Sequence, residues 1–225
     1  MFMAKINLDG GHSIDGKLFR KNLMEWGQRY FRPFQWRVTE DPYLILIAEV
    51  MLHRTRASQV EPVYKKFIEH YPEILTLARA KKDELSEILY PLGLRWRTNL
   101  LSEMTADIVA RFGGKVPEEK DDLMGLPGVS DYIASAVRCF AWNYPEPLVD
   151  TNTVRIIGRV FGLEIKDSSR RNPRFRELIA SNVDHYEPRK YNYALLDLAD
   201  RVCFKVKEPE CNYCPIQESC LYGVQ

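Results

Sequence analysis

The chain has 225 residues, which is enough for one large domain or two small ones. Hydrophobic residues make up 45% and charged residues 28%, a composition that excludes an intrinsically disordered protein. The longest apolar run, Leu44–Leu52, is interrupted by Glu49 and is far shorter than the roughly 20 residues that cross a bilayer. Residues 1–11 lack the apolar core of a secretory signal, so we expect a cytoplasmic protein without membrane contact.

The overall charge is close to neutral, because 32 basic residues face 31 acidic ones. The distribution is uneven: Lys17–Arg37 holds six basic residues against Glu25, and Arg155–Arg176 holds seven against Glu164 and Asp167. Two such segments form either one surface that attracts anions or two ordinary solvated helix faces. Charge alone favours the second interpretation.

Apolar residues recur at helical spacing along most of the chain, and strand patterns are scarce, which predicts an all-α fold. In residues 95–112, for example, Leu101, Met104 and Ile108 lie on one helix face, and Gly113 ends the pattern. The expected helices span about residues 16–31, 41–55, 57–70, 73–79, 82–90, 95–112, 118–125, 130–142, 151–161, 173–184 and 189–203.

Glu49 is the first residue along the chain that suggests a catalytic role. On a helix it would be surrounded by Ile45, Leu46, Leu52 and His53. A carboxyl among apolar neighbours tends to keep its proton, which suits a general acid. The alternative, which the pattern alone favours, is a carboxylate at the solvent edge of an amphipathic helix.

The segment Leu123–Val137 predicts two short helices joined by the turn Leu-Pro-Gly-Val-Ser. Gly128 allows the backbone to turn tightly, and Ser130 is suited to cap the second helix. The exposed N–H groups of such a turn can hold a DNA phosphate without reading the base sequence. Pro-Gly turns are common in all folds, so the turn alone is weak evidence.

Asp150 and the C-terminal cysteines complete the set of candidate residues. Asp150 precedes an expected helix at the N-cap position, where a purely structural role is sufficient. Cys203, Cys211, Cys214 and Cys220 have the spacing C-x7-C-x2-C-x5-C, which suits an iron–sulfur cluster better than the paired C-x2-4-C spacing of zinc sites. The fifth cysteine, Cys139, is expected on the apolar face of a helix, as a residue of the protein core.

Together these features resemble the helix-hairpin-helix DNA glycosylases of the endonuclease III superfamily. The resemblance covers residues 30–220 and is specific, because several motifs occur in one order. Within the superfamily the chain resembles the MutY branch, and there the Mig-type thymine–DNA mismatch glycosylases. The motifs are FQWRVTEDPYLILIAEVMLHRT, PLGLRWR, LPGVSDY, LVDTNTVRI and the four cysteines.

The resemblance implies a fold of two helical lobes: residues 38–143 as a helical barrel with the helix-hairpin-helix, and residues 1–37 with 144–225 as a second lobe that ends in a [4Fe-4S] loop. It implies that Asp150 faces the sugar and that Glu49 lies near the base. It also implies DNA contacts from Gly128 and Ser130, and from His53 and Arg54, which would enter the base stack.

Tyr132 is the residue from which we expect the reaction type. In endonuclease III this position holds the lysine that forms a Schiff base and cuts the strand, and Mig-type enzymes have tyrosine. We therefore expect a monofunctional glycosylase without lyase activity. MutY enzymes also have a C-terminal domain that senses oxidised guanine, whereas this chain ends at Gln225. Both features favour thymine or uracil opposite guanine as the target base, in a duplex bound by a monomer.

Two departures from the family pattern and three alternatives remain. The family spacing is C-x6-C-x2-C-x5-C, one residue shorter in the first gap, and the family turn has Gly where this chain has Ser130. The alternatives are an adenine glycosylase without the sensing domain, a non-catalytic DNA-binding protein and a zinc-binding interaction module. The joint presence of Glu49 and Asp150 argues against the non-catalytic alternative.

Overall fold

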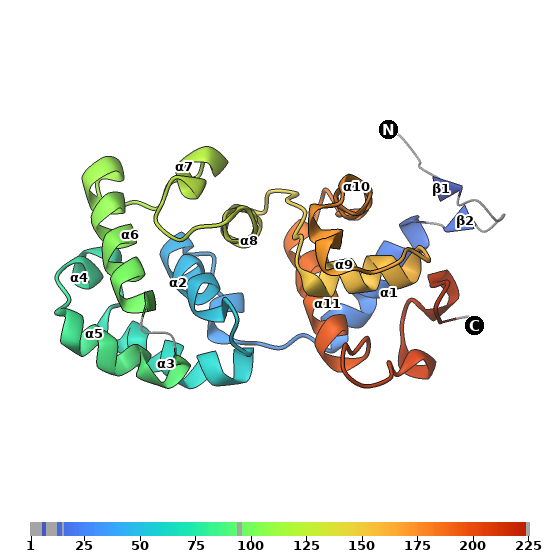
Figure 1. The fold of residues 1–225 in the computed structure, drawn as a ribbon, viewed down its shortest axis with the longest axis horizontal. Coiled ribbons are helices and arrows are strands. Elements are labelled where there is room, and N and C mark those ends of the chain that lie inside the picture. Colours follow the sequence, from blue (N-terminus) through green and yellow to red (C-terminus); the bar gives the residue numbers. More distant parts are fainter. Residues whose placement is uncertain (1–5, 8–12, 15, 94–95, 224–225) are drawn as a thin grey trace. The chain divides into compact units, whose positions relative to one another are not determined.

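The computed structural model describes residues 6–7, 13–14, 16–93 and 96–223. The chain folds into two compact units, residues 33–143 and residues 1–32 with 144–225. Both are helical (Figure 1), as predicted, apart from the short antiparallel pair β1 (Ile6–Asn7) and β2 (Ser13–Ile14). Leu94 and Arg95 of the PLGLRWR motif lie outside the described residues. No helix of the described part is both long and apolar enough to cross a bilayer.

The unit of residues 33–143 is built around the apolar helix α2. Apart from the half-buried Pro42, Leu44 and Leu52, the helix is buried all round, as expected for a central helix. Asp41 caps α2 by accepting a hydrogen bond from the Tyr43 N–H at 2.8 Å. Helix α2 packs against α3 and α8. The elements are η1 (Gln35–Arg37), α2 (Pro42–Leu52), α3 (Ala57–His70), α4 (Ile74–Ala78), α5 (Lys82–Leu89), η2 (Tyr90–Leu92), α6 (Trp96–Phe112), α7 (Lys120–Met124) and α8 (Asp131–Trp142).

The other unit is centred on α1, which lies along α11 (Figure 1). Gly27 of α1 makes this packing possible, because a Cβ atom there would lie only 2.4 Å from the Cβ of Ala194. Phe19, Leu23 and Leu198 are fully buried in the core of this unit. Its helical elements are α1 (Gly16–Arg29), α9 (Thr151–Val160), η3 (Asp167–Arg171), α10 (Pro173–Asn182), α11 (Pro188–Arg201), η4 (Cys211–Tyr213) and η5 (Gln217–Ser219).

The first boundary between the units lies between Arg32 and Pro33, whereas the sequence placed it between residues 37 and 38. Arg32 belongs to the unit of α11, because its Nε lies 2.5 Å from the Asp197 carboxylate. Trp36 belongs to the other unit, where its ring meets the ring of Tyr64 edge-on at 5.2 Å. Single aromatic contacts of this kind leave no periodic pattern in a sequence.

Candidate active site

The turn between α7 and α8 has the geometry expected of a helix-hairpin-helix. Gly128 has a φ of +77°, and a Cβ atom there would lie 2.3 Å from the Leu100 side chain on α6. Both the backbone conformation and the packing therefore require glycine. Ser130 caps α8 as predicted, since its Oγ accepts a hydrogen bond from the Ile133 N–H at 3.3 Å. Serine can therefore replace the second glycine of the family's turn without disturbing the start of α8.

A lysine ties the two helices of the hairpin together. The Lys120 Nζ donates to the Ser135 hydroxyl at 2.8 Å and lies 3.1 Å from the Asp131 carboxylate. Tyr132, in the first turn of α8, is half-buried. The hairpin is therefore a braced unit with Tyr132 at the start of its second helix.

Glu49 is buried in α2, with only 6% of its surface exposed. This burial contradicts the alternative interpretation, a carboxylate at the solvent edge of an amphipathic helix, because α2 is a core helix that packs against α3 and α8. Placing a carboxyl in such surroundings carries a desolvation cost, which is unusual for a residue with only a structural role. The surroundings thus suit the proton-donor hypothesis and leave the role itself a prediction.

His53 and Arg54 follow α2 in an exposed turn. The Thr55 N–H donates to the Leu52 carbonyl at 3.1 Å, which closes the turn. Burial lowers the pKa of the His53 imidazole, and the positive charges of Arg54 and Arg97 lower it further. The imidazole is therefore neutral at physiological pH, while Arg54 supplies the charge of the turn.

Asp150 caps α9 in the other unit, as predicted. Its Oδ1 accepts hydrogen bonds from the N–H groups of Asn152 at 2.8 Å and Thr153 at 2.7 Å, and its Oδ2 accepts one from the Asn152 side chain at 2.9 Å. The Thr153 hydroxyl completes the capping box by accepting from the Asp150 N–H at 3.0 Å. Burial raises the pKa of the Asp150 carboxyl above its usual value, against the opposing effect of these hydrogen bonds.

A chain of hydrogen bonds connects Asp150 to the loop that contains the first cysteine. The Asn152 side chain accepts from Arg155 Nη1 at 3.1 Å, and Arg155 donates to the carbonyls of Ala199 at 3.1 Å and Cys203 at 2.9 Å. The sequence interpretation missed both Asn152 and Arg155. Their only signal was their place shortly after Asp150 within the LVDTNTVRI motif.

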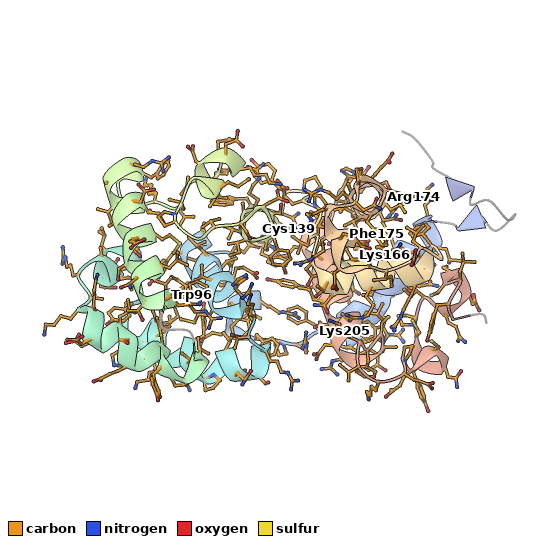
Figure 2. All side chains as sticks on the ribbon, viewed as in Figure 1. Trp96, Cys139, Lys166, Arg174, Phe175 and Lys205 are labelled. Carbon is orange, nitrogen blue, oxygen red and sulfur yellow. The ribbon has the colours of Figure 1, made fainter. Side chains whose placement is uncertain are left out.

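The basic segment 155–176 is not one solvated surface. Arg155 is buried, and Arg159 donates to the Cys203 Sγ at 3.0 Å and to the Phe204 carbonyl at 2.9 Å. The exposed part consists of Lys166, Arg170, Arg171, Arg174 and Arg176, and Lys166 and Arg174 lie close to Phe175 in Figure 2. The basic segment 17–37 also presents less positive charge than its sequence suggests, because Arg32 is paired with Asp197 and Asp200.

The four C-terminal cysteines line one largely apolar cavity beside α9 and α11. Burial raises the pKa of the Cys214 thiol to about 12 and also raises that of Cys220, and the other cysteines of the group add to both effects. Within the described residues, no three histidine, cysteine or acidic side chains converge as ligands of a single metal ion. Cys139 is fully buried in α8 (Figure 2), as expected of a core cysteine.

The candidate residues thus fall into two groups. Glu49, His53, Arg54, the hairpin turn and Tyr132 belong to the unit of residues 33–143. Asp150 and the four cysteines belong to the other unit, where the bonds of Asn152 and Arg155 link Asp150 to the backbone of Cys203.

Comparison with known proteins identifies the family. A family model described as "HhH-GPD superfamily base excision DNA repair protein" matches residues 47–181, which include Glu49, the hairpin and Asp150. The chain belongs to this superfamily. The helix-hairpin-helix that the sequence predicted is therefore the motif that gives the HhH-GPD superfamily its name, and the all-helical fold is that of the superfamily.

Proteins similar to this chain carry the names of DNA glycosylases. The thymine-DNA glycosylase of Aeropyrum pernix is 39% identical over 211 residues, which cover 90% of this chain and 93% of that protein. The thymine/uracil-DNA glycosylase of Pyrobaculum aerophilum is 37% identical over 210 residues, 90% of each chain. A solved structure described as a thermostable thymine-DNA glycosylase matches with a TM-score of 0.86 and 31% identity, covering 93% of this chain and 96% of that one.

Proposed function

We propose that the chain is a DNA glycosylase that hydrolyses the bond between deoxyribose and a thymine or uracil mispaired with guanine. Similarity over nine-tenths of the chain to glycosylases named for thymine and uracil supports the target base. The observation that carries the proposal is Asp150, a carboxylate fixed by three hydrogen bonds at the start of α9. The proposal assigns the chain to the MutY branch, beside the Mig-type enzymes. Tyr132 is consistent with this assignment.

The reaction breaks the C1′–N1 bond of an extruded nucleotide, and the base leaves with the electron pair. Positive charge develops on the sugar, and a carboxylate at Asp150 stabilises it or orients the water that adds to C1′. The water releases one proton to solvent as its oxygen bonds to carbon. The departing base takes up a proton, for which the buried Glu49 is the donor in this proposal. A mispaired base costs less to extrude than a paired one, which supports selection of mismatches.

Tyr132 determines the fate of the strand after excision in this proposal. A phenol cannot form the Schiff base by which an active-site lysine begins strand cleavage. The product is therefore an intact strand with an abasic site. The hairpin turn around Gly128 and Ser130 holds a phosphate of this duplex through backbone N–H groups. His53 and Arg54 contact the duplex from the turn after α2.

The experiment uses purified protein and four duplexes, which contain G·T, G·U, A·G or adenine opposite oxidised guanine. Hot alkali then reveals abasic sites as strand breaks. We expect breaks at T and U opposite G, and only after alkali. Breaks at adenine would instead support the adenine-specific alternative, and the absence of breaks in all four would contradict glycosylase activity.

We also propose that Cys203, Cys211, Cys214 and Cys220 hold a [4Fe-4S] cluster. The chemistry of the four thiols fits this group: they line one cavity, and without a cation burial keeps Cys214 and Cys220 protonated. Bound iron would reverse this preference and deprotonate the thiols. The cluster would supply bonds that fix the C-terminal loop, whose exposed Lys205 (Figure 2) and Lys207 are placed to meet phosphate.

Iron and sulfide analysis of protein purified without oxygen tests the cluster. We expect a brown protein with four iron atoms per chain. Cys214→Ser should lose the colour and fold poorly, whereas Cys139→Ser, at a buried cysteine outside the loop, should keep it. Colourless wild-type protein with stoichiometric zinc would show that the metal is wrong.

A further inference from the structure

A buried arginine, Arg97, lies under the exposed turn that follows α2. Its side chain is fully buried in the first turn of α6, and desolvation lowers the pKa of its guanidinium. The guanidinium donates to the His53 carbonyl, to the Thr55 hydroxyl at 2.8 Å and to the Leu92 carbonyl at 3.5 Å. Burying a cation against neutral oxygens is costly, and these hydrogen bonds offset part of that cost.

The turn itself has an unusual backbone. Its four residues run from Leu52 to Thr55, and His53 has φ −60° and ψ 111°, the values of the first central residue of a type II turn. The second central residue of this turn type needs a positive φ and is normally glycine or asparagine. Here it is Arg54, with a φ of 61°. A long basic side chain therefore occupies a position whose backbone conformation is strained for any residue other than glycine.

The contact of Arg97 explains how this conformation persists. Type I and type II turns differ in the orientation of the central peptide, whose carbonyl here is that of His53. By binding the His53 carbonyl and the Thr55 side chain together, Arg97 favours the type II orientation, which in turn requires the positive φ of Arg54. Trp96 adds support beside it (Figure 2), since its ring meets the His53 ring edge-on at 6.0 Å.

We propose that Arg97 is a positioning residue that holds Arg54 in this left-handed conformation and so presents the Arg54 side chain to the DNA. This inference rests on the proposed function and adds a residue to it. The strained turn is prepared before DNA arrives, so that Arg54 enters the space of the extruded base without first reorganising the backbone. Preorganisation of this kind acts on the extrusion step and leaves the chemistry at the sugar to Asp150.

The test measures extrusion and excision separately. A G·U duplex with 2-aminopurine next to the uracil reports unstacking as a rise in fluorescence, and single-turnover excision of the same duplex reports the reaction. Arg97→Met should reduce both by about 10- to 100-fold, because a displaced contact group loses most of its effect. The lysine of Arg97→Lys can reach either the His53 carbonyl or the Thr55 hydroxyl but not both. This variant should therefore restore part of the fluorescence signal.

Two further variants separate positioning from folding. Thr55→Val removes one acceptor of Arg97 without touching the core and should lower the fluorescence rise in the same direction. Arg111→Met, on the exposed side of α6 where Arg111 pairs with Asp107 at 2.8 Å, is the matched control and should behave as wild type. In an Arg54→Ala background, Arg97→Met should cause little further loss, because both changes remove the same contribution.

The outcomes are distinct for the two proposals. If the wild type excises no base from any duplex, the proposed function fails. If the wild type is active, the inference is overturned when the single variants Thr55→Val and Arg97→Lys both fold and both give the wild-type rise in fluorescence. It is also overturned when the losses in excision rate caused by Arg97→Met and Arg54→Ala are fully additive.

Discussion

Helices α8 and α9 begin with caps of different chemistry, a neutral hydroxyl and a carboxylate. At α8, the Ser130 hydroxyl accepts one hydrogen bond at 3.3 Å. At α9, the Asp150 carboxylate accepts backbone bonds at 2.7 and 2.8 Å and a side-chain bond at 2.9 Å. Serine, asparagine and aspartate cap helices about equally well, so the start of α9 does not need a charge. Burial also raises the pKa of Asp150, which means that the fold disfavours its ionised form.

This difference separates structure from function at two similar positions. The hydroxyl at α8 does what a cap requires, whereas the carboxylate at α9 carries a charge that the helix does not need and that burial makes costly. In our account, that charge stabilises the cationic sugar. Substitutions that keep the cap and remove the charge therefore test the difference.

The largest expected effect is that of Asp150→Asn. Asparagine keeps an acceptor for the Asn152 and Thr153 N–H groups and loses only the acceptor for the Asn152 side chain, so the cap of α9 and the affinity for a G·U duplex should be kept at pH 7. The single-turnover excision rate should fall by about 100-fold or more, because the charge that opposes the developing cation is lost. Excision near the wild-type rate would reduce Asp150 to a structural cap.

Tyr132→Lys tests the position two residues after the Ser130 cap, in the first turn of α8. An amine there, lowered in pKa by partial desolvation, should attack the sugar carbon and give a covalent adduct that borohydride traps, together with strand cleavage without alkali. Tyr132→Met is the control, since it changes the side chain without adding an amine. A folded lysine variant that traps no DNA would place Tyr132 outside the active site.

Arg155→Met should have a smaller effect on the same carboxylate. It leaves the Cys203 and Ala199 carbonyls and the Asn152 side chain without their donor, which should lower the free energy of unfolding by about 1–3 kcal/mol. Excision should fall by about tenfold as Asn152 loses its support. Denaturant unfolding and single-turnover kinetics measure the two effects, and the exposed Arg174→Met should show neither.

The smallest effect is that of Ser130→Ala. Loss of the cap should lower the free energy of unfolding by about 1 kcal/mol and DNA affinity by less than tenfold. The excision rate at saturating protein should stay far above that of Asp150→Asn. Equal losses in both variants would remove the distinction between the two caps.

Local features of this fold could be predicted from the sequence, because their causes are local. The spacing of Leu101, Met104 and Ile108 predicted a helix over 95–112, and α6 spans Trp96–Phe112. The caps at Ser130 and Asp150 and the backbone of Gly128 followed from residue type and position. The pair β1 and β2 could not be predicted, since two residues per strand are too few to show a period.

Interactions between distant segments were not predictable in the same way. Arg155 bonds to carbonyls 44 and 48 residues away, and Arg97 to one 44 residues away. A sequence shows that these arginines exist and does not show which carbonyls will lie beside them. Glu49 illustrates the same limit, because its burial depends on helices that pack over α2 from other parts of the chain.

The pH dependence of single-turnover uracil excision from a G·U duplex tests most directly whether the charge of Asp150 drives the reaction. Because burial raises the pKa of Asp150, the active carboxylate should be lost as the pH falls through a value above the 3.8 of an ordinary aspartate. We therefore expect the wild-type rate to fall on the acid side with an inflection above that value, and the residual rate of Asp150→Asn to lack this inflection. An acid limb that persists in Asp150→Asn would contradict the account.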